Sequence, residues 1–182
     1  MRVEVEEFAG PRLIRPRAFT DARGFFLETY NAARYAGLGV DCTFVQANHS
    51  RSVQGTLRGL HYQSTPGQAK LISVIRGRIF DVAVDIRPES KTFGSWSGVF
   101  LDDELHEQLF LPIGFAHGFC VMSEVADVVY QVTSVYDGPA ECSIRFDDGD
   151  IGVAWPCDSP IVSERDKVAE SFASYRARVQ SQ

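Results

Sequence analysis

The sequence lacks the marks of several large classes of protein. No stretch approaches the roughly 20 consecutive apolar residues that span a bilayer. The opening decapeptide has no apolar core of the kind found in a signal peptide. The cysteines form no CxxC pair and show no metal-ligand spacing, which predicts free thiols that serve mainly as small buried hydrophobes: Cys42, Cys120, Cys142 and Cys157. These absences predict a cytoplasmic protein without a membrane span.

An excess of basic residues is also absent. The formal net charge is −6, whereas a general nucleic-acid surface needs a positive field. This balance argues against a nucleic-acid partner, but not against a small anionic ligand, because a pocket has its own local charge. A length of 182 residues with 45% hydrophobic residues predicts one domain, 1–182, with a substantial core.

Short segments with two-residue alternation indicate strands. In 78–86 (RIFDVAVDI) four apolar residues at alternate positions share one face, while Asp81 and Asp85 share the other. Residues 128–136 (VVYQVTSVY) show the same period. The thirteen Phe, six Tyr and two Trp favour a β-rich interior. Several such segments, separated by glycine-containing turns, predict an all-β architecture.

Helical patterns occur at only two places. Residues 30–36 read as a short helix that ends at Gly37. Residues 166–179 carry apolar side chains at helical spacing. Many short strands, few helices and no repeat predict a β-sandwich or barrel with a short C-terminal helix.

The stretch LFLPIGFAHGF at 109–119 contains the pattern PxGxxHxF, which resembles the second motif of the cupin jelly roll. In metal-binding cupins the first motif supplies two histidines two residues apart and then a glutamate. The corresponding stretch here reads His61-Tyr62-Gln63. His61 and His117 are two ligands at most, whereas a divalent metal needs three or more. The prediction is a metal-free cupin jelly-roll barrel that uses no cofactor.

A more specific resemblance runs from about residue 10 to about residue 170. The stretches that carry it are FTDARGFFLETY (19–30), QANHSRS (46–52), GTLRGLHYQ (55–63), QAKLISVIRGRIFDVAVDIRPESKTFGSW (68–96), LPIGFAHGF (111–119), ADVVYQVTSVY (126–136) and SERD (163–166). Together they resemble the dTDP-4-dehydrorhamnose 3,5-epimerase family. The resemblance implies an isomerase that inverts C3 and C5 of dTDP-4-dehydro-6-deoxy-glucose, giving dTDP-4-dehydro-L-rhamnose for deoxysugar biosynthesis. It also implies a homodimer that binds a dTDP-linked 4-keto-6-deoxy sugar.

Inversion beside a ketone needs a base on one face of the sugar, an acid on the other and a cation near the enolate oxygen. By resemblance, His61 is the base, Tyr130 the opposing acid and Lys70 the cation. An imidazole accepts protons near neutral pH, and a phenol, with an ordinary pKa of about 10, keeps its proton there. From the residues alone, a structural histidine, a barrel-interior tyrosine and a solvated lysine are the favoured readings.

Asp166 has two readings. By resemblance it is the carboxylate partner of His61, which would fix the imidazole tautomer and stabilise the imidazolium, as in catalytic triads. The local sequence Ser163-Glu-Arg-Asp166 also fits a helix capping box. Both readings can hold together.

The resemblance further implies a set of substrate-binding residues. Three arginines match positions around the diphosphate, which a guanidinium binds as a fork. Phe26 follows a pattern in which an N-terminal segment reaches the neighbouring subunit's pocket. His117 reads either as a binding residue or as an orphaned metal-ligand position retained for packing. Tyr136, six residues after Tyr130, would point into the same cavity from a regular strand and pack against the base. The set is Arg23, Phe26, Glu28, Gln46, Asn48, Arg58, His117, Tyr136, Glu141 and Arg165.

One conflict concerns Arg58 and His61. They are three residues apart, so a regular strand would point them to opposite faces, although both are assigned to one pocket. Glycine inside a strand often marks a bulge. The sequence therefore predicts an irregular ladder near Gly59.

Three alternative functions stay open on the sequence. The first is a mono-epimerase that inverts C3 or C5 alone. The second is a metal-dependent cupin, and the third is a cupin that binds sugar nucleotides without catalysis.

Overall fold

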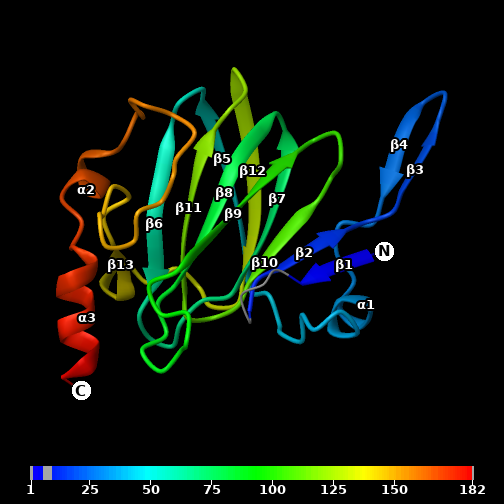
Figure 1. Ribbon diagram of the computed structural model, residues 1–182. Helices are drawn as coiled ribbons and strands as arrows, with labels where there is room; N and C mark the ends of the chain where they lie inside the picture. Colours follow the sequence, from blue (N-terminus) through cyan, green and yellow to red (C-terminus); the bar gives the residue numbers. More distant parts are fainter. Residues whose placement is uncertain (1, 6–9, 182) are drawn as a thin grey trace.

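Two antiparallel sheets face each other in the computed structural model, which describes residues 2–5 and 10–181 (Figure 1). The six-stranded sheet has the order β1-β2-β10-β7-β12-β5. Its strands are β1 (Arg2–Val5), β2 (Arg12–Arg15), β10 (Gln108–Leu111), β7 (Lys70–Arg76), β12 (Val125–Val132) and β5 (Gln46–Val53). The five-stranded sheet has the order β13-β6-β11-β8-β9. Its strands are β13 (Glu141–Ser143), β6 (Leu57–Gln63), β11 (Phe115–Val121), β8 (Arg78–Asp85) and β9 (Trp96–Asp102).

The remaining elements lie outside this sandwich. Strands β3 (Ala18–Asp21) and β4 (Gly24–Leu27) form a hairpin that projects from the body on the side away from α2 and α3 (Figure 1). The helices are α1 (Ala32–Ala36), the 3-10 turn η1 (Gly138–Ala140), α2 (Glu164–Lys167) and α3 (Phe172–Gln180). The predicted all-β jelly-roll barrel with a short C-terminal helix and few other helices is confirmed.

Apolar side chains from both sheets fill part of the space between them. Ile72 and Val128 come from the six-stranded sheet, and Ile79 and Phe119 come from the five-stranded sheet. All four are buried in one cluster, against which Tyr130 packs. Tyr130 therefore lies on the inward face of β12, at the border between the apolar core and the polar part of the barrel.

The alternation in β8 assigns its two faces to different environments. Val82 and Val84 are buried in a second cluster together with Phe172 and Tyr175 of α3. Asp81 alternates with these valines, so it points between the sheets and is 0% exposed. The apolar face of this strand is thus the outer one, because helix α3 covers it.

The predicted helix 166–179 is wrong as one element. Helix α2 ends at Lys167 and α3 begins at Phe172, with Ser171 accepting a hydrogen bond from the backbone N–H of Ser174 as an N-cap. Between them Glu170 forms a bridge with Ile144 of the segment after β13. The bridge takes residue 170 out of helical geometry and divides the pattern.

The predicted strand 128–136 is too long. Strand β12 ends at Val132, and the hydroxyl of Ser134 donates to the carbonyl of Gly67 at 3.0 Å. Tyr136 lies beyond the strand, so its orientation does not follow from the even spacing to Tyr130. In the part of the chain that the structure describes, no helix has the length and apolar character needed to cross a membrane.

Candidate active site

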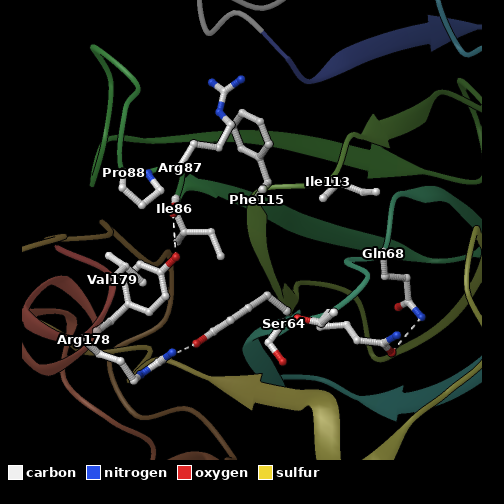
Figure 2. Close-up of a pocket in the computed structure, with 14 residues that line it drawn as sticks. Ser64, Gln68, Ile86, Arg87, Pro88, Ile113, Phe115, Arg178 and Val179 are labelled. Atoms are coloured by element: carbon white, nitrogen blue, oxygen red, sulfur yellow. Dashed lines mark hydrogen bonds between the residues drawn. The ribbon is translucent and has the colours of Figure 1, made fainter. Parts of the chain in front are cut away.

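One cavity of the described part of the chain contains none of the predicted catalytic residues. It has a volume of about 500 Å³ and lies between the C-terminal helix and the loops at the ends of β6 and β8 (Figure 2). Its two arginines already have carboxylate partners: Arg87 binds Asp85 at 2.7 Å and Arg178 binds Glu170 at 2.6 Å. A second hollow of about 380 Å³ is lined by Arg58, His61, Arg165 and Asp166 among others. The chemistry of these side chains makes the second hollow the candidate active site.

His61 and Asp166 are in hydrogen-bond contact at the wall of this hollow. The His61 Nε2 and Asp166 Oδ1 atoms are 2.7 Å apart, although the residues are 105 positions apart in the chain. The imidazole is 28% exposed and the carboxylate 4%. Among the described residues no hydrogen bond to Nδ1 of His61 is found, so that nitrogen is available to a ligand. One ring nitrogen is held by a carboxylate, and the imidazole belongs to a residue that lines the hollow.

Burial by itself would raise the pKa of Asp166. The hydrogen bonds from His61, the Ser163 hydroxyl and the Gly59 backbone outweigh burial, so the pKa lies below its usual value. A carboxylate that stays ionised in this position stabilises a positive charge that forms beside it. The pair can therefore take up a proton on His61 without leaving an uncompensated charge.

Helix α2 carries Asp166 and begins with a cap. The Ser163 hydroxyl accepts a hydrogen bond from the backbone N–H of Asp166 at 3.1 Å, which is the N-cap interaction that the SERD pattern predicts. The carboxylate of Asp166 extends to His61. Both sequence readings of this segment hold, because the backbone N–H of Asp166 serves the cap and its side chain meets the histidine.

The strand that carries His61 is irregular at Gly59. His61 is opposite His117 of β11, and Arg58 is opposite Phe119. Three positions on β6 therefore match two positions on β11, which is a bulge. Gly59 has φ of 129°, and a Cβ atom there would lie 2.8 Å from the carbonyl oxygen of His117. The predicted irregularity is confirmed, and Arg58 and His61 line the same hollow.

A second histidine–aspartate pair lies deeper in the barrel. His117 Nε2 is 3.0 Å from both carboxylate oxygens of Asp81. The two side chains are 8% and 0% exposed. Burial lowers the pKa of His117, with the Asp81 charge acting in the opposite direction and those of Lys70 and His61 reinforcing burial. The mutual influence of these groups shows that the two pairs and Lys70 belong to one electrostatic neighbourhood.

Lys70 is buried, with 8% of its surface exposed. Burial lowers its pKa to about 8, and the negative charges of Asp81 and Glu141 only partly offset the effect. Its Nζ donates to the backbone carbonyl of His61 at 3.5 Å. Lys70 is thus a poorly solvated cation next to the strand that carries the histidine, which is the environment in which an ammonium best stabilises a nearby oxyanion.

Tyr130 faces inward from β12, where its strand partner on β5 is Asn48. Burial, followed by the charge of Glu141, raises the pKa of its phenol, while the Arg58 charge acts to lower it. A raised pKa keeps the proton on the hydroxyl at neutral pH. The charges of Glu141 and Arg58 act on the phenol, and Arg58 is one of the residues that line the hollow.

A group of polar side chains is connected to Arg165, one of the residues that line the hollow. Arg165 Nη1 is 2.6 Å from Glu141 Oε2, and the nearby Glu141 raises the pKa of the exposed Tyr136. Gln46 joins the same region, since its Oε1 accepts from the backbone N–H of Tyr136 at 2.9 Å and its Nε2 donates to Asn48 at 2.8 Å. These contacts bring five predicted binding residues together and fix Tyr136 through its backbone rather than through the strand.

Three predicted binding residues do not join this cluster within one chain. Arg23 and Phe26 lie on the hairpin that projects away from β6 and α2 (Figure 1). Arg23 pairs with Asp21 at 2.5 Å, and Phe26 is 71% exposed. Glu28 follows the hairpin and binds Arg34 at 2.9 Å. Among the described residues no group of three or more His, Cys, Asp and Glu side chains is arranged to hold a metal ion.

Comparison with known proteins identifies one family. The sequence model of the dTDP-4-dehydrorhamnose 3,5-epimerase family matches residues 6–174. The chain belongs to this family. A dTDP-4-dehydrorhamnose 3,5-epimerase of Methanothermobacter thermautotrophicus is 48% identical over 161 residues, covering 87% of this chain and 87% of the relative. A dTDP-4-dehydrorhamnose 3-epimerase of Streptomyces niveus is 38% identical over 178 residues, covering 97% and 86%.

A crystal structure from Legionella pneumophila, a 3,5-epimerase in complex with dTDP-4-keto-L-rhamnose, is similar to this epimerase with a TM-score of 0.94. It is 43% identical in sequence, and the match covers 98% of this chain and 96% of that chain. Family membership makes the protein an isomerase of the epimerase type, as the sequence resemblance implied. The roles of single residues stay predictions.

Two residues of this epimerase's site were missed at the level of sequence. The sequence pattern places Asp81 on one face of a strand but does not pair it with His117. The available signal was its position on the face opposite the apolar residues. Ser52 accepts a hydrogen bond from Arg58 Nε at 3.1 Å. It lies an even number of residues from Gln46 and Asn48 along β5, in the segment QANHSRS, so it shares their face of the strand. That even spacing was the signal that could have found it.

Proposed function

We propose that the protein inverts C3 and C5 of dTDP-4-dehydro-6-deoxy-glucose to give dTDP-4-dehydro-L-rhamnose. The observation that carries the proposal is the 2.7 Å contact between His61 and Asp166, with a free ring nitrogen in a hollow that two arginines also line. The reaction belongs to deoxysugar biosynthesis, the role that family membership supports.

In the proposed mechanism His61 removes the proton on the carbon next to the C4 ketone. The electron pair moves into the ketone and forms an enolate. The negative charge of Asp166 stabilises the resulting imidazolium, and the Lys70 ammonium stabilises the enolate oxygen, a charge that is present only along the reaction coordinate. Tyr130 then returns a proton to the opposite face of the same carbon. Solvent then takes the proton from His61 and returns one to Tyr130, and the same steps at the other flanking carbon complete the two inversions.

The anionic end of the substrate fits the charges at the mouth of the hollow. Arg58 and Arg165 both line it, and guanidinium groups bind diphosphate oxygens in pairs. Arg165 is already held by Glu141 and half exposed, so its free N–H groups can reach a phosphate without losing the carboxylate. Tyr136, 61% exposed and close to Glu141, offers an aromatic face to the nucleotide base, and Gln46 and Asn48 supply amide groups.

A homodimer completes this proposal. A two-stranded hairpin is at best marginally stable in water, and β3–β4 presents Phe25 at 58% and Phe26 at 71% exposure. We propose that a second copy of the chain covers these side chains, so that Arg23 and Phe26 join the partner's hollow. Cytoplasmic location and the absence of a nucleic-acid partner stay predictions from the sequence.

Mixing two inactive variants tests the shared site. A His61→Ala subunit keeps an intact hairpin, and an Arg23→Ala/Phe26→Ala subunit keeps an intact base. Random pairing of equal amounts should restore about a quarter of wild-type activity, because half the dimers are mixed and each has one complete site. No recovery above the two separate variants would contradict the sharing of residues between subunits.

Turnover in deuterated water tests the reaction itself. Deuterium at both C3 and C5 of the product, read by NMR, is the expected result. The 38% identity to a 3-epimerase gives a mono-epimerase as the second candidate, and deuterium at one carbon alone would establish it in place of the first. Retained activity after exhaustive chelation would argue against the metal-dependent alternative, and absence of any exchange would favour a binding protein.

A further inference from the structure

Two cysteines that the reaction does not use lie in contact. The Sγ atoms of Cys120 and Cys157 are 2.9 Å apart, although the residues are 37 positions apart in the chain. Cys120 alternates in β11 with Phe119 and Val121, which belong to the central core, so its side chain points out of the sheet. Cys157 lies in the long segment that follows β13 and crosses this outer face. Cys120 is buried, whereas Cys157 is partly exposed.

The segment that carries Cys157 leads directly to the candidate active site. Ile161 bridges Thr56 at the start of β6, and its carbonyl accepts from the backbone N–H of Leu57 at 2.9 Å. Two residues later Ser163 caps α2, whose Asp166 meets His61. The cysteine contact therefore joins the strand of His117 to the segment that carries the partner of His61.

The other two cysteines offer no such contact. Cys42 packs at the edge of the cluster under α1, and Cys142 packs at the edge of the cluster under α3. All four thiols are free in the structure. An oxidation product that links Cys120 to Cys157 would thus be specific to one place in the fold.

We propose that Cys120 and Cys157 form a site of disulfide formation that locks the segment carrying Asp166 onto β11 without changing the catalytic geometry. A disulfide bond is about 2.05 Å long, so the sulfur atoms need to move by less than an ångström. Such a short movement leaves the backbone of α2 where it is. The bond is therefore expected to stabilise the active enzyme rather than to inhibit it.

The reaction requires an oxidant, for which a small-molecule disulfide such as oxidised glutathione suffices. The Cys157 thiolate, the more exposed of the two, attacks the oxidant and forms a mixed disulfide, releasing one glutathione thiolate. The Cys120 thiolate then attacks the Cys157 sulfur and expels the second glutathione thiolate. The two protein protons end on the two reduced glutathione molecules. Burial, together with the neighbouring thiol, raises the pKa of Cys120 to about 12, so the second step is expected to be faster at alkaline pH.

The test uses a Cys42→Ser/Cys142→Ser background, in which the pair supplies the remaining thiols. After incubation of the folded protein with oxidised glutathione, intact mass should fall by the mass of two hydrogen atoms, and peptide mapping should find Cys120 joined to Cys157. A further Cys120→Ala change should leave a stable glutathione adduct on Cys157, because the resolving thiol is gone. A Cys157→Ser change should leave Cys120 unmodified.

Two further readouts follow the lock itself. The oxidised protein should melt roughly 5 to 10 °C higher than the reduced protein, because the bond closes a long loop, and its epimerase turnover should change less than twofold. Persistence of two free thiols in the folded protein would overturn the proposal. So would a loss of most activity on closing the bond, since that outcome requires the Asp166 segment to move.

Discussion

Two histidine–aspartate pairs in the barrel, His61–Asp166 and His117–Asp81, use the same side chains in different settings. His61 and Asp166 meet at 2.7 Å, with the imidazole 28% exposed at the wall of a hollow. His117 and Asp81 meet at 3.0 Å on neighbouring strands, with the imidazole 8% and the carboxylate 0% exposed. The first aspartate comes from a helix far along the chain, and the second from the adjacent strand.

The difference in exposure suits the two pairs to different tasks. One pair can exchange protons with a ligand, and the other holds side chains in fixed positions. A partly exposed imidazole with one free ring nitrogen can pass a proton to and from a ligand. The buried His117 imidazole contacts both oxygens of one carboxylate, and burial lowers its pKa. It is therefore poorly placed to take up and release protons. We therefore propose that His61 and Asp166, the outer pair, carry base catalysis. We propose that His117 and Asp81, the inner pair, serve mainly to hold the structure beside Lys70.

Replacing the outer histidine should have the largest effect. His61→Asn should lower kcat by about 10³- to 10⁴-fold, because it removes the base while keeping a polar side chain of similar shape. Steady-state kinetics measure the change, and circular dichroism verifies the fold. His49→Asn is the matched control, since His49 also pairs with an aspartate, Asp127 at 2.9 Å, but on the outer face of β5. A comparable loss of kcat in His49→Asn would show that the loss is not specific to the histidine at the hollow.

Replacing the outer aspartate should have the next largest effect. Asp166→Asn keeps the size of the side chain but loses the charge that stabilises the imidazolium, so kcat should fall by about 10²- to 10³-fold. The double variant with His61→Asn should be no slower than His61→Asn alone, because the two residues act as a unit. Additive losses in the double variant would show that Asp166 acts independently of His61.

The protonation of Lys70 predicts an alkaline limit. Burial lowers its pKa to about 8, so the ammonium is present below that pH and is lost as the pH rises through it. Turnover should then fall by about tenfold for each further pH unit, because a neutral amine does not stabilise an enolate. Lys70→Arg, whose guanidinium stays protonated, should move this limit to higher pH. An unchanged limit in that variant would assign it to another group.

The inner pair should affect stability more than chemistry. Asp81→Asn leaves a buried imidazole without its carboxylate and should lower the free energy of unfolding by about 2–4 kcal/mol. Urea denaturation measures this effect. The kcat of Asp81→Asn should decline less than that of Asp166→Asn. A larger decline in a variant that keeps full stability would show that the inner pair takes part in the proton transfer.

The smallest effect is expected at the cap of α2. Ser163→Ala should cost about 1 kcal/mol of stability and reduce kcat less than tenfold, because Asp166 keeps its bond to His61. Ser171→Ala is the matched control, since Ser171 caps α3 away from the hollow. It should lose similar stability with unchanged kcat. Equal kinetic effects of the two variants would indicate a global rather than a local change.

The sequence predicts the barrel because alternation is a local property, and the strand at 78–86 illustrates both its power and its limit. The period of two identifies β8, but it does not tell which face points between the sheets. Both faces are covered, one by α3 and one by the opposite sheet, so Asp81 is buried beside His117 in a way that no local pattern specifies.

The candidate site likewise has one part that the local sequence predicts and another that it does not. Gly59 signals the bulge that turns Arg58 and His61 to one hollow, because only glycine tolerates the close approach to β11. The contact between His61 and Asp166 spans 105 residues, and the sequence proposes it only through resemblance to a family. The position of Tyr136 was inferred from even spacing, and that inference failed because Ser134 binds the turn at Gly67 and ends the strand.

The exchange of substrate protons for solvent deuterium in two single variants tests the central claim most directly. NMR would follow deuterium at C3 and C5 in His61→Asn and in His117→Asn under saturating substrate. Exchange at both carbons should be lost in His61→Asn and should persist, at a reduced rate, in His117→Asn. Exchange at the wild-type rate in His61→Asn, or its loss only in His117→Asn, would contradict the assignment of base catalysis to His61.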